Sequence, residues 1–121
     1  LYLKLLDPSL PSPSKKLQTL LEEAKDGFLS INSNQIQITL ALAHLRNESP
    51  DQALVALGAP NNWRKWLTAR PAWSFIASQI YRLNHESGKA LALKQKVEFS
   101  KMDKAERTSL NQLFPNEFTN P

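Results

Sequence analysis

The chain has no cysteine and only three glycines among its 121 residues. Without cysteine it forms neither disulfides nor thiolate metal sites. The scarcity of glycine disfavours turn-rich β architectures and the glycine-rich loops that cradle phosphates. The longest apolar runs fall far short of the roughly 18 residues that a membrane span needs. The remaining composition, 41% hydrophobic and 21% charged residues, is typical of a globular protein, and the length suits one domain.

Catalytic motifs are missing as well. The sequence contains no phosphate-binding loop, no GxSxG and no HExxH. We interpret His44 as a packing residue in an apolar helix and His85 as a surface turn residue, because metal sites need clustered ligands. Glu22, Glu23 and Asp26 form an acidic helix face that we interpret as solvating charge. We therefore expect no enzyme activity, catalytic residue, cofactor or metal in this segment.

The chain opens with the short apolar stretch LYLKLL, which starts at Leu1. This stretch is too short for the apolar core of a signal peptide, which spans roughly 7–15 residues. We expect the sequence to be a fragment of a longer protein, so that a catalytic part could lie outside it.

Positive charge is concentrated in the second half of the chain. Residues 63–107 hold ten Lys/Arg against four Asp/Glu, a net charge of +6, whereas residues 1–62 hold five against six. This asymmetry indicates an anionic partner such as a nucleic acid. The alternative is that these helix surfaces are simply rich in lysine.

Apolar residues recur at helical spacing along most of the chain, and no segment reads convincingly as a strand. The first helix starts at Ser12-Pro13 and carries an apolar stripe to a helix end near Gly27. The pattern predicts about seven helices. After the first, the expected helices are residues 35–47, 50–57, 62–69, 71–83, 89–100 and 103–114.

Local start and stop signals support several of these helices. Ser49 is a capping residue, Pro50 suits the first turn, and Gln52 lies three residues after Ser49, as in a capping box. Gly58 is placed to end that helix in the left-handed conformation. Asp103 with Glu106 resembles a second capping box.

Proline-rich ends frame the helical region. Residues 7–14, DPSLPSPS, hold three prolines and three serines, so we interpret residues 1–14 as a linker or extended lead-in. Residues 15–114 are expected to form a single α-helical domain. Pro115 ends the last helix, and residues 115–121 are expected to be a loose tail.

Two segments repeat each other at an interval of 37 residues. Ala53-Leu54 and Ala90-Leu91 each follow a short polar turn, which in turn follows an amphipathic helix. The repeated unit is helix, turn, helix, and its period is typical of α-helical solenoids.

The repeat resembles the tetratricopeptide family, whose first helix has a small residue with an aromatic residue three positions on and an alanine nine positions further. The matching residues are Ser78, Tyr81 and Ala90 in the later unit and Ala41, His44 and Ala53 in the earlier one. The resemblance covers roughly residues 34–100 and implies antiparallel helix pairs stacked as a short solenoid. Lys94 stands where the family has an aromatic residue in the second helix.

The resemblance also implies a concave groove, lined by the first helices, that binds an extended peptide or a partner helix. The matched groove positions are Gln35, Ile38, Leu42 and Arg46 in the earlier unit and Phe75, Gln79, Arg82 and Leu83 in the later one. Because Ile38 and Leu42 are apolar, we expect the helix that carries Leu17, Leu20 and Leu21 to cover them.

The segment NNWRKWLTARPAW, residues 61–73, gathers all three tryptophans of the chain. Its tryptophans fit a packed wedge between the helical units, a protein contact, or a base-stacking surface flanked by cations. Helical spacing favours the wedge, because Trp63, Trp66 and Leu67 share a side that Arg64 and Lys65 do not. Arg64, Lys65 and Arg70 remain candidates for partner contact.

We therefore expect an all-α tetratricopeptide-like domain that binds another protein or peptide segment or acts as a structural scaffold. The alternatives are a basic domain that binds nucleic acid or another polyanion, and a helical accessory domain of an enzyme. The candidate partner-binding residues are Phe75, Gln79, Arg82, Arg46, Arg64, Lys65 and Arg70.

Overall fold

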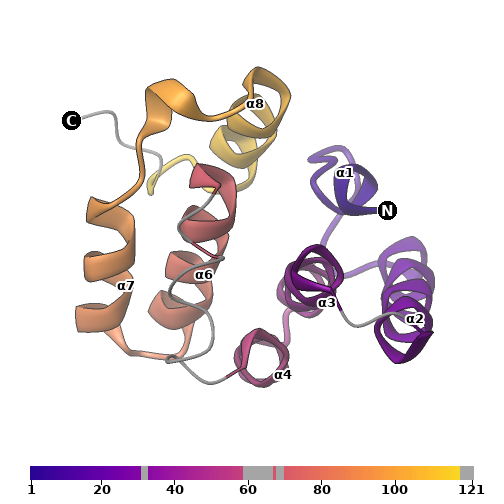
Figure 1. The fold of residues 1–121 in the computed structure, drawn as a ribbon. Coiled ribbons are helices and arrows are strands. Elements are labelled where there is room, and N and C mark those ends of the chain that lie inside the picture. The colour runs from indigo at the N-terminus through magenta and orange to yellow at the C-terminus, as the bar shows by residue number, and fades with distance from the viewer. Residues whose placement is uncertain (31–32, 59–66, 68–69, 118–121) are drawn as a thin grey trace.

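The computed structural model describes residues 1–30, 33–58, 67 and 70–117. These residues form seven α-helices and one short 3-10 helix and contain no strand (Figure 1), so the expected all-α class is confirmed. The elements are α1 (Tyr2–Leu5), α2 (Lys15–Ser30), α3 (Asn34–Arg46), α4 (Pro50–Leu57), α6 (Pro71–Leu83), α7 (Ser87–Gln95), η1 (Phe99–Lys101) and α8 (Lys104–Leu113).

Helices α3 and α6 are the centres of two packed groups (Figure 1). Helix α3 packs against α1, α2 and α4, whereas α6 packs against α7 and also contacts α3 and α4. The rings of Phe99 and Phe114, which flank α8 in the chain, both meet Phe75 of α6 edge-on at a centroid distance of 6.0 Å. The segment after α7 therefore folds back over α6.

One hydrophobic core runs through both groups. It explains the apolar stripes of the sequence, because each stripe faces the core and burying one large apolar side chain contributes about 1.5–3 kcal/mol. The fully buried large side chains include Leu5, Leu17, Ile38, Leu42, Leu57, Leu67, Phe75, Ile76, Ile80 and Leu110.

Helices α3 and α4 form one hairpin and α6 and α7 form another, and the two turns repeat the same backbone hydrogen bonds 37 residues apart. Glu48 and His85 hold corresponding places and have φ of 59° and 61°, a conformation that reverses the chain tightly. The recurring donor–acceptor pairs are Asn47–Ala43, Glu48–Leu45, Ser49–His44 and Ala53–Ser49, matched by Asn84–Ile80, His85–Arg82, Glu86–Tyr81 and Ala90–Glu86.

The asparagine of each turn fastens its hairpin to the preceding helix. The Asn47 Nδ2 atom donates to the carbonyl of Leu17 at 3.1 Å, and the Asn84 Nδ2 atom donates to that of Pro50 at 2.8 Å. Each amide also donates to the carbonyl four residues earlier in its own helix. The 37-residue repeat of the sequence is thus also a repeat of side-chain contacts.

The structure of residues 1–14 differs from the expected linker. Residues 2–5 form helix α1, and Tyr2, Leu5 and Leu6 are buried in the core. The hydroxyl of Ser14, rather than that of Ser12, accepts a hydrogen bond from the Leu17 amide at the start of α2. The short lead-in packs because its leucines find apolar neighbours on α3, which the local pattern could not show.

Two of the predicted helix ends need correction in detail. Ser49 precedes α4 with Pro50 in the first turn, but its side chain makes no capping hydrogen bond. Gly58 has the expected positive φ of 87°, yet its ψ of −176° is extended rather than left-handed helical. The Gln37 Nε2 atom donates to the Leu57 carbonyl at 2.7 Å and so satisfies an orphan acceptor at this helix end.

The C-terminal part also differs from expectation. The predicted helix over residues 89–100 ends earlier, at Gln95, and a separate 3-10 turn follows at Phe99–Lys101. Residues 115–117 are not a loose tail, because the Glu117 amide closes a turn onto Phe114 and its carboxylate forms ion pairs. Residues 118–121 lie outside the described part of the chain. No helix within that described part has the length and apolar character needed to cross a membrane.

Candidate partner-binding site

The groove expected on the first hairpin is covered. Ile38, Leu42 and Arg46 are buried, and only Gln35 among the matched positions is exposed. Helix α2 packs against α3, as anticipated from the apolar character of this face. Of these four positions, only Gln35 lines a pocket, which has a volume of about 310 Å³ and lies between α1, α2 and α3.

Arg46 is held by the lead-in rather than exposed to a partner, which corrects its assignment as a partner-binding residue. Its guanidinium donates to the carbonyls of Leu5 at 2.5 Å, Asp7 at 3.0 Å and Leu10 at 2.5 Å, and its Nε atom donates to the Ser12 hydroxyl at 3.0 Å. Desolvation by burial lowers the pKa of Arg46, although a guanidinium stays charged at any ordinary pH. One buried cation thus binds four acceptors of residues 5–12.

Two of the three candidate partner-binding residues on α6, Phe75 and Gln79, are also buried. Phe75 is enclosed by the rings of Phe99 and Phe114, and Gln79 is only 1% exposed. Neither side chain contacts a partner from the surface, so the sequence-based assignment is corrected for both. The reason is the return of the chain after α7, which covers the face that an open solenoid would leave free.

Arg82 is the partly exposed predicted residue that lines an open pocket, and the buried Gln79 lines it too. The pocket has a volume of about 270 Å³ and lies between α6, α7 and the C-terminal turn, lined by Gln79, Arg82, Ser87, Leu91, Lys94 and Glu117. Leu91 is 56% exposed and lines the pocket together with these charged side chains. Leu83, the other matched position, is exposed at the end of α6.

Two cations from different helices converge on one carboxylate in this pocket. The Glu117 Oε1 atom lies 3.2 Å from Arg82 Nε and 3.6 Å from Lys94 Nζ. The three side chains remain partly exposed, at 28%, 38% and 22% for Glu117, Arg82 and Lys94. The lysine that departs from the tetratricopeptide pattern is therefore part of the pocket, not of a helix interface.

The buried Gln79 holds Arg82 in position through a hydrogen bond. Its Oε1 atom accepts from Arg82 Nε at 2.9 Å, and its Nε2 atom donates to the Ser78 hydroxyl at 3.4 Å. A buried amide that fixes a guanidinium lowers the conformational entropy lost when that guanidinium binds an anion. Although it is buried, Gln79 thus remains part of the site as a positioning residue.

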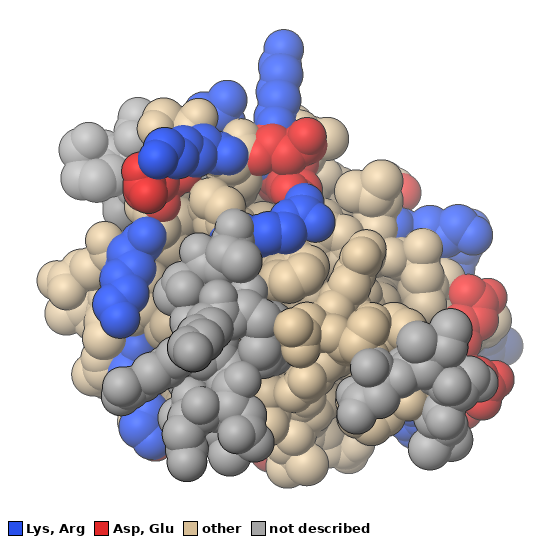
Figure 2. Space-filling model, in the orientation of Figure 1, with Lys and Arg blue, Asp and Glu red and all other residues tan. Residues whose placement is uncertain are grey.

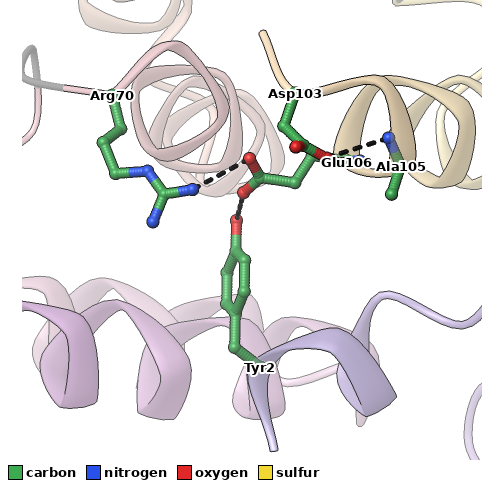
Figure 3. Close-up of polar contacts among 5 residues, drawn as sticks. All are labelled: Tyr2, Arg70, Asp103, Ala105 and Glu106. Atoms are coloured by element: carbon green, nitrogen blue, oxygen red, sulfur yellow. Dashed lines mark hydrogen bonds and ion pairs between the residues drawn. The ribbon is translucent and has the colours of Figure 1, made fainter.

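Arg70 belongs to a different cluster, which Figure 3 shows. Its guanidinium pairs with Glu106 at 3.0 Å and lies over the ring of Trp73 at 5.2 Å. The second oxygen of Glu106 accepts from the Tyr2 hydroxyl at 2.7 Å, so the carboxylate joins α1 and α8. Desolvation by burial, with the hydrogen bond to Glu106 adding to it, raises the pKa of Tyr2.

Asp103 and Glu106 therefore form only half of the predicted capping box. The Asp103 carboxylate accepts from the amides of Ala105 at 2.9 Å and Glu106 at 3.3 Å, as a cap should. The Glu106 side chain turns away from the helix start to Tyr2 and Arg70. The sequence carried no signal for this cluster, because its members come from opposite ends of the chain.

Most described cations of the basic half are paired with acids. Of the Lys/Arg in residues 70–107, ion pairs form at Arg70, Arg82, Lys89, Lys94 and Lys101. In the face drawn in Figure 2, blue side chains stand beside red ones at several places. Pairing of this kind interrupts the continuous positive surface that a phosphate backbone needs.

The remaining candidates are placed as follows. His44 is buried, and desolvation lowers its pKa, whereas His85 is exposed in its turn. Glu22, Glu23 and Asp26 lie on the exposed face of α2. Across residues 1–30, 33–58, 67 and 70–117, no cluster of three or more acids and histidines could hold a metal ion.

The tryptophan segment is described only in part. Trp73 is buried in α6 and Leu67 is fully buried, which fits the packed side of the predicted wedge. Trp63, Trp66, Arg64 and Lys65, together with the helix expected over residues 62–69, fall outside the described residues apart from Leu67.

In comparisons with known proteins, no family model, curated protein or solved structure gives a significant match to this chain. The tetratricopeptide resemblance therefore depends on the residues and the repeated hairpins alone.

Proposed function

We propose that this chain is a non-catalytic protein-interaction module, tetratricopeptide-like in architecture, that binds a peptide segment of a partner in the pocket between α6 and α7. The observation that supports it is the contrast between the two repeated hairpins. The first is covered by α1 and α2, and the pocket of about 310 Å³ that these helices form with α3 has no Lys or Arg in its described lining. The second has a pocket where Leu91 is exposed beside Arg82 and Lys94. Exposed apolar groups beside oriented cations are typical of peptide-binding surfaces.

The pocket is small enough to hold one or two side chains of an extended segment rather than a whole domain. Its volume of about 270 Å³ is near the lower end of the roughly 300–1,000 Å³ typical of ligand sites. A peptide seated there would also run along α7, where Ser87 and Leu91 are exposed on successive turns. Affinity from so small a surface is expected to be modest.

Site-specific photo-crosslinking tests this proposal. A photoreactive amino acid placed at Ser87 should crosslink a partner in cells, whereas the same group at Thr108, exposed on α8, should not. The identified partner is then purified and titrated against the chain by calorimetry. Leu91→Asp should weaken binding at least about tenfold, because it removes the apolar contact and puts a charged side chain in its place.

The control variant is Val55→Asp, which introduces the same charge at an 81% exposed position on α4. The proposal is wrong if Leu91→Asp and Val55→Asp leave the affinity for the purified partner equally unchanged. Turnover of a substrate by the chain would overturn the non-catalytic part.

Binding of a polyanion is the second candidate, suggested by the net charge of +6 over residues 63–107. The ion pairs along α6, α7 and η1 make it weaker than the peptide proposal, because paired cations release fewer counterions from a phosphate backbone. Fluorescence anisotropy with a labelled DNA duplex and a single strand at about 50 mM salt decides it. Binding that falls steeply with added salt would favour this candidate.

A helical accessory domain of an enzyme is the third possibility, and it is compatible with a partner-binding pocket. The sequences on either side of this segment would decide it, because a catalytic motif there would give the pocket a neighbouring domain as its partner.

A further inference from the structure

The pocket between α6 and α7 already contains a carboxylate from its own chain. Glu117 belongs to the turn that follows α8, and its Oε1 atom lies between Arg82 and Lys94. Two cations facing one carboxylate leave a net positive charge at this end of the pocket. The pocket lining also includes the apolar side chains of Ala90 and the exposed Leu91.

Arg82 is oriented by groups other than Glu117. The buried Gln79 accepts its Nε–H at 2.9 Å and is itself bonded to Ser78, so the guanidinium keeps its place if Glu117 leaves. The ion pairs to Glu117 are partly exposed, and such pairs contribute little free energy. Glu117 is therefore held by weak ion pairs that a competing carboxylate can replace without moving Arg82.

We propose that the Arg82–Lys94 pair is a carboxylate-binding site that Glu117 occupies in cis and that an acidic peptide segment of a partner takes over in trans. This inference rests on the proposed function, because it assigns the partner's chemistry at the same pocket. The partner segment carries an aspartate or glutamate for the two cations and an apolar side chain next to it for Leu91. The C-terminal turn thereby lowers the apparent affinity for any such partner.

The cis contact sets a quantitative expectation. A tethered group competes at an effective concentration in the millimolar range. Removing the Glu117 charge should therefore tighten binding of a weak acidic peptide by roughly tenfold. Removing both cations should abolish the preference for an acidic peptide altogether.

Nuclear magnetic resonance titrations of the full ¹⁵N-labelled chain test this directly. The probe is the blocked heptapeptide PNEFTNP, the sequence of residues 115–121, and its control is the same peptide with glutamine in place of glutamate. In the Glu117→Gln chain, the acidic peptide should shift the Arg82 Nε–H and Leu91 amide signals and bind about tenfold more tightly than the glutamine peptide. The wild-type chain should bind the acidic peptide about tenfold more weakly than Glu117→Gln.

The cations are tested in the Glu117→Gln background. Arg82→Gln with Lys94→Gln should erase the difference between the two peptides, whereas the control Lys101→Gln, whose partner is Glu98, should keep it. Circular dichroism melts verify that each variant is folded. Equal binding of the two peptides by the folded Glu117→Gln chain overturns the carboxylate site. Equal binding of the acidic peptide by wild type and Glu117→Gln overturns the cis competition.

The same cation variants separate this inference from the proposed function. If a purified partner identified by crosslinking binds Arg82→Gln/Lys94→Gln as well as wild type, and loses affinity with Leu91→Asp, the pocket binds a partner without recognising a carboxylate. The carboxylate site is then wrong while the interaction module stands.

Discussion

The two hairpins share one backbone and differ in what covers it. Their turns use the same hydrogen bonds at an interval of 37 residues, and each is fastened to the preceding helix by an asparagine. The first hairpin is closed by apolar packing from α1 and α2, whereas the second is partly closed by the turn that carries Glu117. Repetition of the backbone therefore does not imply repetition of the surface.

Corresponding residues make the difference explicit. Arg46 corresponds to Leu83. Arg46 is buried and donates hydrogen bonds to four acceptors, whereas Leu83 is exposed. Leu42 corresponds to Gln79, and both are buried, but only Gln79 has a polar side chain to orient a neighbour. A repeated helical hairpin becomes a candidate binding surface when the segment that covers it is polar and leaves a pocket open.

The largest expected effect is at Arg46. Arg46→Met leaves the acceptors of Leu5, Asp7, Leu10 and Ser12 without their donor. The contact to Leu5 is buried and the other three are partly buried, and an unsatisfied buried group costs about 1–3 kcal/mol. Allowing for water reaching part of the lead-in, we expect a loss of about 3–5 kcal/mol in urea denaturation. Leu83→Met, at the corresponding position, should change stability by less than about 0.5 kcal/mol. Similar losses of stability at Arg46 and Leu83 would mean that the segments covering the two hairpins contribute equally to the free energy of unfolding.

The next largest effect is expected at the hydrogen bond between Tyr2 of α1 and Glu106 of α8. Tyr2→Phe removes the hydroxyl that donates to the buried Glu106, and we expect the free energy of unfolding to fall by about 1–3 kcal/mol. Urea denaturation at neutral pH measures it. No loss would show that the cover of the first hairpin is independent of α8.

The same variant has a signature at high pH. Because burial raises the pKa of Tyr2 in the folded chain, the unfolded chain releases this proton first, above its ordinary pKa of about 10. The wild type therefore loses up to about 1.4 kcal/mol per pH unit above that pH from this residue alone. Its advantage over Tyr2→Phe should shrink between about pH 10 and 11, and a constant difference would contradict the buried, protonated hydroxyl.

A smaller effect separates the two asparagines. Asn84→Ala removes two hydrogen bonds and should cost about 1–2 kcal/mol. Asn47→Ala removes the equivalent two, but the Asn47 Oδ1 atom is buried without a partner, so its removal also relieves a penalty. Thermal melts should place Asn47→Ala above Asn84→Ala. The reverse order would mean that the first turn contributes more than the second.

The smallest effect is a pH dependence that arises from His44 in the first hairpin. His44 corresponds to Tyr81, and desolvation by burial, with a contribution from Lys25, lowers the pKa of His44. The folded chain resists protonation that the unfolded chain accepts, so stability present above the ordinary histidine pKa of about 6.5 is lost as the pH falls below it. His44→Gln should flatten the decline between about pH 6.5 and 5 by at most about 1.4 kcal/mol per unit. An unchanged profile would place the acid-sensitive group elsewhere.

The sequence was informative where structure is local. Pro50 and Pro71 start helices where expected, Gly58 ends one with positive φ, and the turns at Asn47 and Asn84 match because their signals lie within a few residues. Apolar periodicity likewise predicted the buried faces, since a helix must bury its stripe.

The site was predicted less well, because it depends on segments that return from a distance. Phe75 and Gln79 occupy groove positions by spacing, but Phe99 and Phe114 close over that face. Arginine is usually a surface residue, and the carbonyls that Arg46 binds belong to Leu5, Asp7 and Leu10, far from it in sequence. Glu117 lies two residues after Pro115 in a polar tail and gave no signal of the pocket, and Lys94 was predicted only as a departure from the repeat pattern.

The hydrogen bond between Tyr2 and Glu106 joins residues 104 positions apart, which matters during synthesis. At about 5–20 residues per second, a ribosome makes Glu106 roughly 5–20 s after Tyr2. Arg46, in contrast, emerges after all of its acceptors have been made, so the lead-in can close around it while α6 is still being translated. The lead-in can therefore pack on the first hairpin before synthesis of the chain is complete. The hydroxyl of Tyr2 finds its acceptor, Glu106, only after α8 leaves the ribosome.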